Sequence, residues 1–227
     1  MRYDAVVFDA DGVLVEPTAT ATLRRAIRRA FADHGVADPA EDAVDGLQAT
    51  TTEELRSIAE RYGLDDPAAF WASRDDHASA AQREAVRAGE KILYDDVDAA
   101  LALPVPLAIV SNNQQATVDF VVEQAGLGDH FAPVFGRQPT LEDITRKKPE
   151  PHYLQRAIDD LGAERPLFVG DSNVDLAAAA AAGVDSAFIR RPHRADYVLD
   201  HEPTYVIESL DELAGIVAAD APARTDD

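Results

Sequence analysis

Three short apolar runs in the sequence are each followed directly by acidic, hydroxyl or amide side chains. The runs cover residues 5–8, 107–110 and 167–169, and every residue in them is apolar. The carboxyl ends of parallel strands meet at one edge of a sheet, where α/β proteins bind ligands. We therefore expect the polar side chains after these runs to lie close together: Asp9, Asp11, Ser111, Asn112, Asp171 and Asp175.

The residue types in this set fit phosphoryl-transfer chemistry. Carboxylates held close together repel one another, and Mg²⁺, held by one or two carboxylates with waters and a substrate phosphate, relieves that repulsion. Asp9 and Asp11 are two residues apart, so both point to the same side of an extended segment. One can attack while the other handles a proton, a serine can hold a phosphoryl oxygen, and a lysine can neutralise charge. This set predicts transfer through an aspartyl-phosphate.

Four segments of the sequence, taken in order, resemble motifs I to IV of the haloacid dehalogenase-like (HAD) hydrolases. They are FDADGVL at 8–14, VSN at 110–112, KPEP at 148–151 and GDSNVD at 170–175. The resemblance covers nearly the whole chain. The long segment between the first two motifs is similar in position to the helical C1 cap of one subfamily. That subfamily includes phosphoglycolate-phosphatase-like enzymes.

The resemblance implies a role for each catalytic position. Asp9 would be the nucleophile that forms the phospho-aspartate, and Asp11 would protonate the leaving oxygen and then deprotonate a water. Ser111 would bind the transferred phosphoryl group with help from the amide of Asn112. Lys148 would pair with Asp9 and the phosphoryl group.

The resemblance also implies a Mg²⁺ site. Its ligands would be Asp9, the backbone carbonyl of Asp11, and Asp171, while Asp175 would orient a metal-bound water. Lys147 stands where the family often has a glycine. We therefore expect Lys148, which directly precedes the proline of the third motif, to be the lysine that enters the active site.

Alternating strand-like and helix-like segments predict the elements that position these residues. Further strands are expected at 187–189 and 134–135, and helices at 22–34, 52–62, 67–89, 115–125, 151–161 and 175–182. We expect an α/β fold with a Rossmann-like parallel sheet flanked by helices. Residues 1–16 and 92–217 would form the core, 17–91 an inserted all-helical cap, and 218–227 a flexible tail.

Two features of the predicted cap could contact a substrate. Arg24, Arg25, Arg28 and Arg29 form two i,i+4 pairs that could reach an anionic group, although a solvated face paired with surface acids explains them better. Residues 46–52 could form a specificity loop that faces the site.

Composition excludes several classes of protein. The 227 residues carry 42 acidic and 21 basic side chains, a net charge of −21, which disfavours nucleic acid and anionic membranes as partners. The chain has no cysteine for disulfides or thiolate metal sites. The acidic start is unlike a signal peptide and no apolar run is long enough to span a bilayer, so we expect a cytoplasmic protein. The excess of arginine (18) over lysine (3), together with 42 alanines, favours a halophilic protein.

These observations predict a Mg²⁺-dependent phosphatase acting on a small phosphorylated metabolite. An aspartate at position 11 argues against a dehalogenase, which needs no acid for its leaving group. A phosphonatase would need a Schiff-base lysine in the cap, where Lys91 is the only lysine. The alternatives are a phosphomutase of the β-phosphoglucomutase type and a non-catalytic metal-binding regulatory protein. The sequence does not indicate the oligomeric state.

Overall fold

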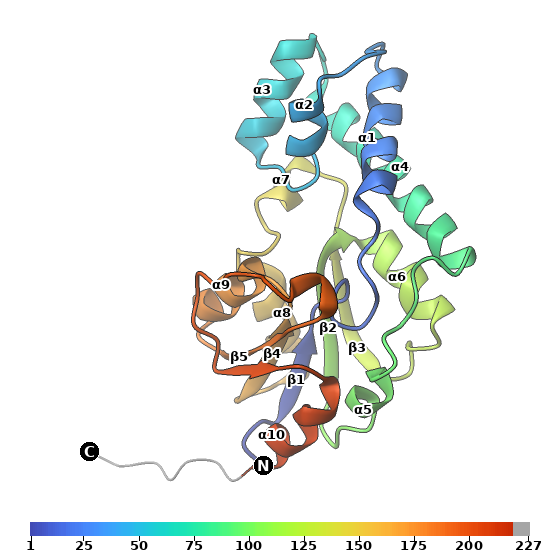
Figure 1. Ribbon diagram of the computed structural model, residues 1–227. Coiled ribbons are helices and arrows are strands. Elements are labelled where there is room, and N and C mark those ends of the chain that lie inside the picture. Colours follow the sequence, from blue (N-terminus) through green and yellow to red (C-terminus); the bar gives the residue numbers. More distant parts are fainter. Residues whose placement is uncertain (220–227) are drawn as a thin grey trace.

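A six-stranded parallel sheet forms the centre of the computed structural model, which describes residues 1–219 (Figure 1). The strand order is β3-β2-β1-β4-β5-β6, and all neighbouring strands are parallel. The strands are β1 (Ala5–Phe8), β2 (Leu107–Gln114), β3 (Phe131–Arg137), β4 (Pro166–Gly170), β5 (Asp185–Ile189) and β6 (Tyr205–Ile207). The predicted α/β fold with a Rossmann-like parallel sheet is confirmed.

Strand β1 lies at the switch point of this sheet, between β2 and β4. Its last residue, Phe8, is in register with Ile109 of β2 and Val169 of β4. The next backbone N–H, that of Asp9, still donates to the carbonyl of Val169 at 2.9 Å. Strands β1 and β4 therefore end within one residue of each other, while β2 continues to Gln114. This edge is the place where ligands bind in open α/β sheets.

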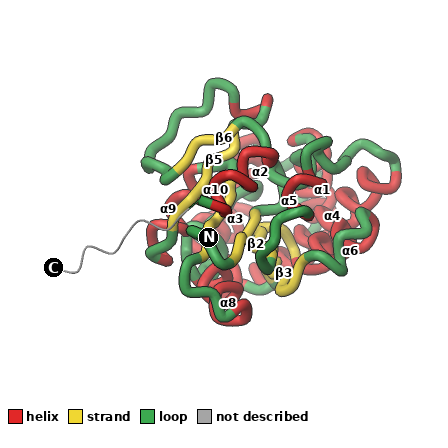
Figure 2. The backbone as a smooth tube through the Cα atoms, turned by 90° about the horizontal axis from the view of Figure 1, so that it is seen from below, coloured by secondary structure: helices red, strands yellow, loops and turns green. Residues whose placement is uncertain are grey.

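Both faces of the sheet are covered by helices (Figure 2). Val6 and Phe8 pack with α5 (Val97–Leu101), α6 (Gln115–Gln124) and α10 (Leu213–Ala218) on one face. Val7 points to the opposite face and packs with α8 (His152–Leu161) and α9 (Asn173–Ala182). Alternate residues are thus buried on opposite sides, which explains why the strands are continuously apolar in sequence.

Helices α1 to α4 follow β1 and pack together above the sheet (Figure 1). They are α1 (Thr20–Asp33), α2 (Glu41–Gly46), α3 (Thr52–Tyr62) and α4 (Pro67–Arg87). Their buried side chains, including Phe31, Leu55, Phe70 and Trp71, form a cluster separate from the two clusters beside the sheet. These helices have a hydrophobic core of their own.

The remaining elements are short: α7 (Leu141–Ile144) and the 3-10 helices η1 (Pro192–Arg194) and η2 (Leu210–Glu212). No helix within residues 1–219 is both long and apolar enough to cross a membrane. Of the predicted tail 218–227, Ala218 ends α10, and residues 220–227 lie outside the described part of the chain.

Candidate active site

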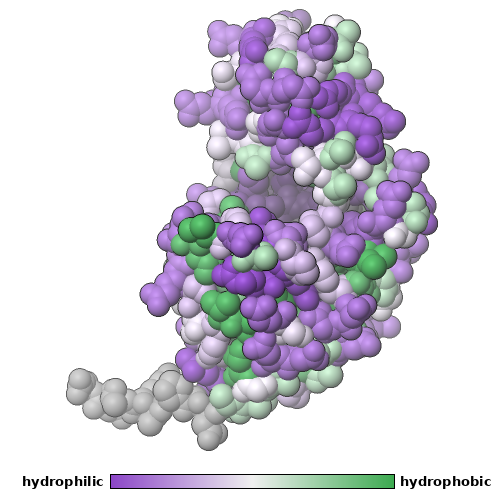
Figure 3. All heavy atoms as spheres, viewed as in Figure 1, coloured by the Kyte–Doolittle hydropathy of each residue, from purple (hydrophilic) through white to green (hydrophobic). Residues whose placement is uncertain are grey.

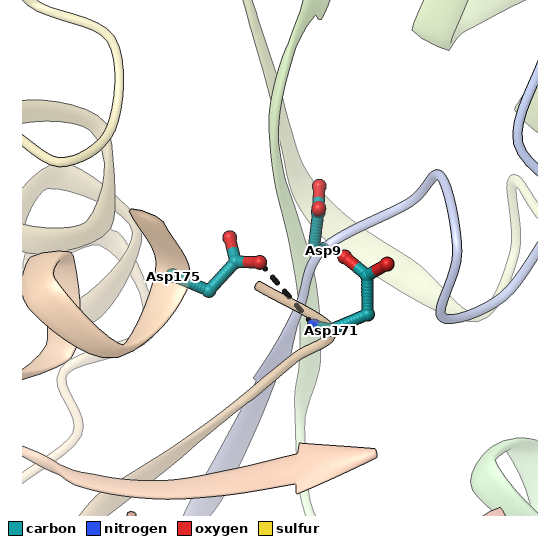
Figure 4. Close-up of side chains that lie close together, drawn as sticks. All are labelled: Asp9, Asp171 and Asp175. Carbon is teal, nitrogen blue, oxygen red and sulfur yellow. Dashed lines mark hydrogen bonds between the residues drawn. The ribbon is translucent and has the colours of Figure 1, made fainter. Parts of the chain in front are cut away.

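Three carboxyl groups converge at the carboxyl edge of the sheet (Figure 4). Asp9 follows β1, Asp171 follows β4, and Asp175 lies in the first turn of α9. All three are buried, and one oxygen from each lies within 4.8 Å of the others. The structure therefore brings together three of the acidic residues that the sequence indicated.

Asp175 is fixed by the turn that begins α9. Its Oδ2 accepts hydrogen bonds from the N–H groups of Asp171 (3.3 Å) and Ser172 (3.1 Å). The Ser172 hydroxyl caps the helix in return. Gly170 is required beside this carboxylate, because a Cβ there would lie 2.3 Å from the Cβ of Asp175. The GDSNVD segment thus forms a rigid turn between strand and helix.

Lys148 supplies the cation inside this acidic cluster. Its buried Nζ lies 2.9 Å from Asp9 Oδ1 and 2.7 Å from Asp175 Oδ1, and donates to the carbonyl of Val110 at 2.9 Å. Burial alone would lower the pKa of Lys148, but the two carboxylates outweigh it and raise that pKa. Lys147 instead donates to the carbonyl of Thr50 at 2.7 Å.

The electrostatics of Asp9 are dominated by its burial. Desolvation raises its pKa to about 8; Lys148 opposes this rise, and the charges of Asp175 and Asp171 add to it. Such a carboxyl group needs a further cation beside it to stay ionised at neutral pH.

Asp171 has partners that the sequence did not indicate. Its Oδ2 lies 2.8 Å from His193 Nε2 and 2.9 Å from Arg194 Nε, both in η1, which follows β5. Burial would raise the pKa of Asp171, but these two contacts outweigh it and lower that pKa. The lowered pKa keeps Asp171 in its carboxylate form, which is the form that can ligate a metal ion.

Two adjoining cavities lie at this end of the sheet. One, of about 330 Å³, is lined by Asp9, Lys148 and Asp171. The other, of about 290 Å³, extends toward α1 to α4. Asp11, Pro17 and Asn112 line both cavities. In Figure 3 a recess opens between the upper helices and the lower part of the molecule, whose visible face is mostly hydrophilic.

Residues 3–183 match the family model of the haloacid dehalogenase-like hydrolases. The chain belongs to this family. A phosphoglycolate phosphatase from Yersinia pseudotuberculosis is 32% identical over 78% of this chain and 77% of its own length. A pyrophosphatase PpaX from Oceanobacillus iheyensis is 30% identical over 55% of this chain and 58% of its own length. The chain spans about half the length of several curated relatives that it matches.

Solved structures of HAD-like proteins share the fold of the whole chain. CbbY from Rhodobacter sphaeroides, in complex with phosphate, has a TM-score of 0.66 at 22% identity and covers 93% of this chain and 96% of its own. The HAD-hydrolase YfnB from Bacillus subtilis, bound to magnesium, has a TM-score of 0.60 at 20% identity and covers 96% of this chain and 100% of its own. The family and fold predicted from the motifs are both confirmed.

In this HAD-like hydrolase, Asp11 lies apart from the three clustered carboxylates and has its own partners. It forms an ion pair with Lys91, whose side chain is 1% exposed, and accepts a hydrogen bond from Asn113 Nδ2 at 2.8 Å. Gln82 of α4 in turn contacts both Lys91 and Asn113. From the sequence, Lys91 is assigned only a Schiff-base role in the phosphonatase alternative. Its local spacing does not indicate the contact with Asp11, which is 80 positions away.

Ser111 and Asn112 lie within β2, which continues to Gln114, so the expectation that they follow the end of this strand is wrong. Asn112 lines both cavities, whereas Ser111 is not among the lining residues of either. The Asn112 side chain donates to the carbonyl of Lys148 at 2.8 Å and accepts from the N–H of that residue at 2.7 Å. This pair of hydrogen bonds fixes the Lys148 backbone against β2. Ser111 is buried, and its Oγ accepts from the N–H of Asn113 at 3.2 Å.

The four arginines of the first helix do not line either cavity. Arg24 forms ion pairs with Glu41 and Asp45 of α2, and Arg28 pairs with Glu41. These two arginines thus connect α1 to α2 through surface acids, as the interpretation of a solvated face predicts. The loop at 46–52 does reach the second cavity, through Gln48 and Ala49.

Gly12 makes the close approach at Asp171 feasible. Its φ is +83°, in the left-handed region, and a Cβ there would lie 2.4 Å from Asp171 Oδ2 and 3.1 Å from His193 Nε2. Gly35 has the same φ, but no atom lies within 4 Å of its would-be Cβ. A comparison of alanine substitutions at these two glycines therefore separates the cost of backbone strain from the cost of a collision with Asp171.

We predict that Gly12→Ala destabilises the fold more than Gly35→Ala does. Gly35→Ala should cost about 1 kcal/mol from backbone strain alone, and Gly12→Ala at least about 1 kcal/mol more, because the Asp171 carboxylate must move. Denaturant unfolding of both variants measures the difference. Equal losses would show that Asp171 does not need the space at position 12.

Proposed function

We propose that this protein is a Mg²⁺-dependent phosphatase that hydrolyses a small phosphomonoester through an aspartyl-phosphate on Asp9. The observation that carries the proposal is the buried Asp9 carboxylate, held 2.9 Å from Lys148 Nζ and open to a cavity. Relatives named phosphoglycolate phosphatase and pyrophosphatase support hydrolysis of small phosphorylated compounds.

The donor set suits Mg²⁺. Asp9, Asp171 and Asp175 offer oxygen ligands within 4.8 Å of one another, and hard cations prefer such ligands. Asp9 and Asp171 would hold the ion together with the carbonyl of Asp11, and Asp175, already bonded to Lys148, would orient a water. When bound, Mg²⁺ would neutralise charge on the phosphoryl group.

The chain's own residues divide the reaction into two displacements. A carboxylate oxygen of Asp9 attacks phosphorus, the bond from phosphorus to the leaving oxygen breaks, and Asp11 gives that oxygen a proton. Asp11 then takes a proton from water as the water oxygen attacks phosphorus, which releases phosphate and regenerates the Asp9 carboxylate. Lys148, Ser111 and the amide of Asn112 hold the phosphoryl oxygens throughout.

Residues 17–91 act as a cap in this proposal. They hold helices α1 to α4 with their own core, and their loop at 46–52 lines the second cavity. Helices with their own hydrophobic core above the strand ends can open for substrate and close to exclude water.

Asp9→Asn should abolish phosphate release while the protein stays folded. The amide is a far weaker nucleophile, so we expect a loss on the order of 10⁴-fold. Phosphate release from a panel of small phosphoesters with Mg²⁺ measures this, with the exposed Asp38→Asn as a matched control. Retained activity in Asp9→Asn would exclude Asp9 as nucleophile, and phosphoryl return to a sugar without phosphate release would identify a mutase.

Chelation and pH test the metal site. EDTA should stop turnover, and added Mg²⁺ should restore it. Because the pKa of metal-free Asp9 is raised to about 8, Mg²⁺ must displace its proton below that pH. Calorimetry should therefore show Mg²⁺ affinity rising by up to about tenfold per pH unit below pH 8, and levelling off above it. Full activity in EDTA, or an affinity that does not change with pH, would contradict this assignment.

Lys91→Met should weaken the reaction through Asp11. Without the buried ammonium group, Asp11 loses the contact that fixes its carboxylate, and kcat for an alkyl phosphate should fall about tenfold with little change in KM. p-Nitrophenyl phosphate has a leaving group that needs no proton, so its turnover should fall much less. The exposed Arg87→Met is the control. Equal losses on both esters would mean that Lys91 serves only the fold.

A further inference from the structure

Several cationic side chains line the second cavity. Arg74 of α4, Arg137 at the end of β3, and Lys147 all line it. These residues come from segments far apart in the sequence, and none of them takes part in the mechanism proposed above. We call Trp71, Arg74, Arg137 and Lys147 the cationic wall.

The two arginines of this wall share one carboxylate. Arg137 binds Asp75 through both terminal nitrogens, one of them at 2.7 Å, and Arg74 Nη1 lies 2.9 Å from the same group. Burial would raise the pKa of Asp75, but the arginines outweigh it and lower that pKa. Two buried positive charges are thus balanced by one negative charge.

Lys147 adds a third positive charge, and no carboxylate of the described residues 1–219 forms a salt bridge with it. Its Nζ donates to the carbonyl of Thr50 and keeps two further donors. Burial, followed by repulsion from Arg137 and Arg74, lowers the pKa of Lys147 to about 8; Asp75 and Glu54 oppose this shift without cancelling it. Positive charge is in excess at this wall.

Trp71 provides a donor that also lacks a partner. Its ring lies between the guanidinium groups, 4.9 Å from Arg74 Cζ and 4.8 Å from Arg137 Cζ. Its Nε1 is buried and has no acceptor within the described part of the chain. An indole N–H can only donate, and a buried unsatisfied donor is costly. A bound anion would balance the excess positive charge and would also accept a hydrogen bond from the indole N–H.

Asp11 relates this wall to the chemistry. It lines both cavities, and in the proposed function it protonates the leaving oxygen. The phosphoryl group lies beside Asp9 in the first cavity, so the rest of the substrate extends past Asp11 into the second. This second cavity, of about 290 Å³, has room for the leaving group of a phosphoester.

We propose that the cationic wall binds a negative charge on the leaving group of the substrate. This inference rests on the proposed function and names its substrate class: small phosphoesters or phosphoanhydrides whose leaving group carries its own oxyanion. A carboxylate and a second phosphate share this chemistry. Lys147 is the most accessible cation of the wall and contributes to specificity.

The experiment compares three substrates in one buffer with Mg²⁺ and constant salt. 2-Phosphoglycolate carries a carboxylate, pyrophosphate carries a second phosphate, and 2-hydroxyethyl phosphate is a neutral match in size. We expect kcat/KM to be at least about tenfold higher for one or both charged substrates than for the neutral one. The better of the two charged substrates identifies the oxyanion.

Lys147→Met should reduce this charged-to-neutral ratio about tenfold or more, mainly through KM. Arg146→Gln, which alters the adjacent cation outside the cavity, should leave the ratio unchanged. A ratio that Lys147→Met does not alter, or a preference for 2-hydroxyethyl phosphate, would overturn the inference.

Failure of the proposed function gives a different result, because wild type would then release phosphate from none of the three substrates. Calorimetric binding to the Asp9→Asn protein still tests the wall in that case. Tighter binding of 2-phosphoglycolate than of 2-hydroxyethyl phosphate, lost in Asp9→Asn/Lys147→Met, would support it. Equal binding of the two would overturn it.

Discussion

Repulsion among three buried carboxylates is the constraint on which the arrangement of this site depends. Asp9, Asp171 and Asp175 lie within 4.8 Å of one another, where water cannot screen their charges. The fold answers with Lys148 between Asp9 and Asp175, and with His193 and Arg194 against Asp171. Lys148 does not offset the burial of Asp9, whose pKa stays raised, and a divalent cation beside Asp9 would supply the missing positive charge.

Negative and positive side chains lie on different sides of the two cavities. The strand ends hold the acidic cluster, whereas α4 and β3 bring Arg74 and Arg137 to the second cavity. Asp11 lies between them, paired with Lys91. We interpret the acidic side as the place where phosphorus reacts and the cationic side as the place where the leaving group is recognised. The residues of the cationic wall, which come from α4, β3 and the segment between α7 and α8, would then decide which phosphoester reacts.

Much of the fold could be predicted from local sequence, because strands buried on both faces are continuously apolar. The polar residues after β1 and β4 mark their ends, whereas β2 continues through its polar residues to Gln114, which its apolar pattern does not show. Residues 134–135 indicated β3, but β6 and α2 were missed since three and six residues leave too short a pattern. The contacts of Lys91 and of Asp75 could not be predicted. The Lys91–Asp11 pair joins residues 80 positions apart and the Asp75–Arg137 pair joins residues 62 positions apart, so only tertiary packing brings these partners together.

A covalent phosphoryl group on Asp9 is the central claim, and trapping it is the most direct test. The enzyme would be mixed with its best substrate and Mg²⁺, quenched in acid within one turnover, digested and analysed by mass spectrometry. The account predicts a phosphoryl adduct on the peptide that contains Asp9, which disappears as turnover ends. Phosphate release without any adduct, or an adduct on another residue, would contradict it.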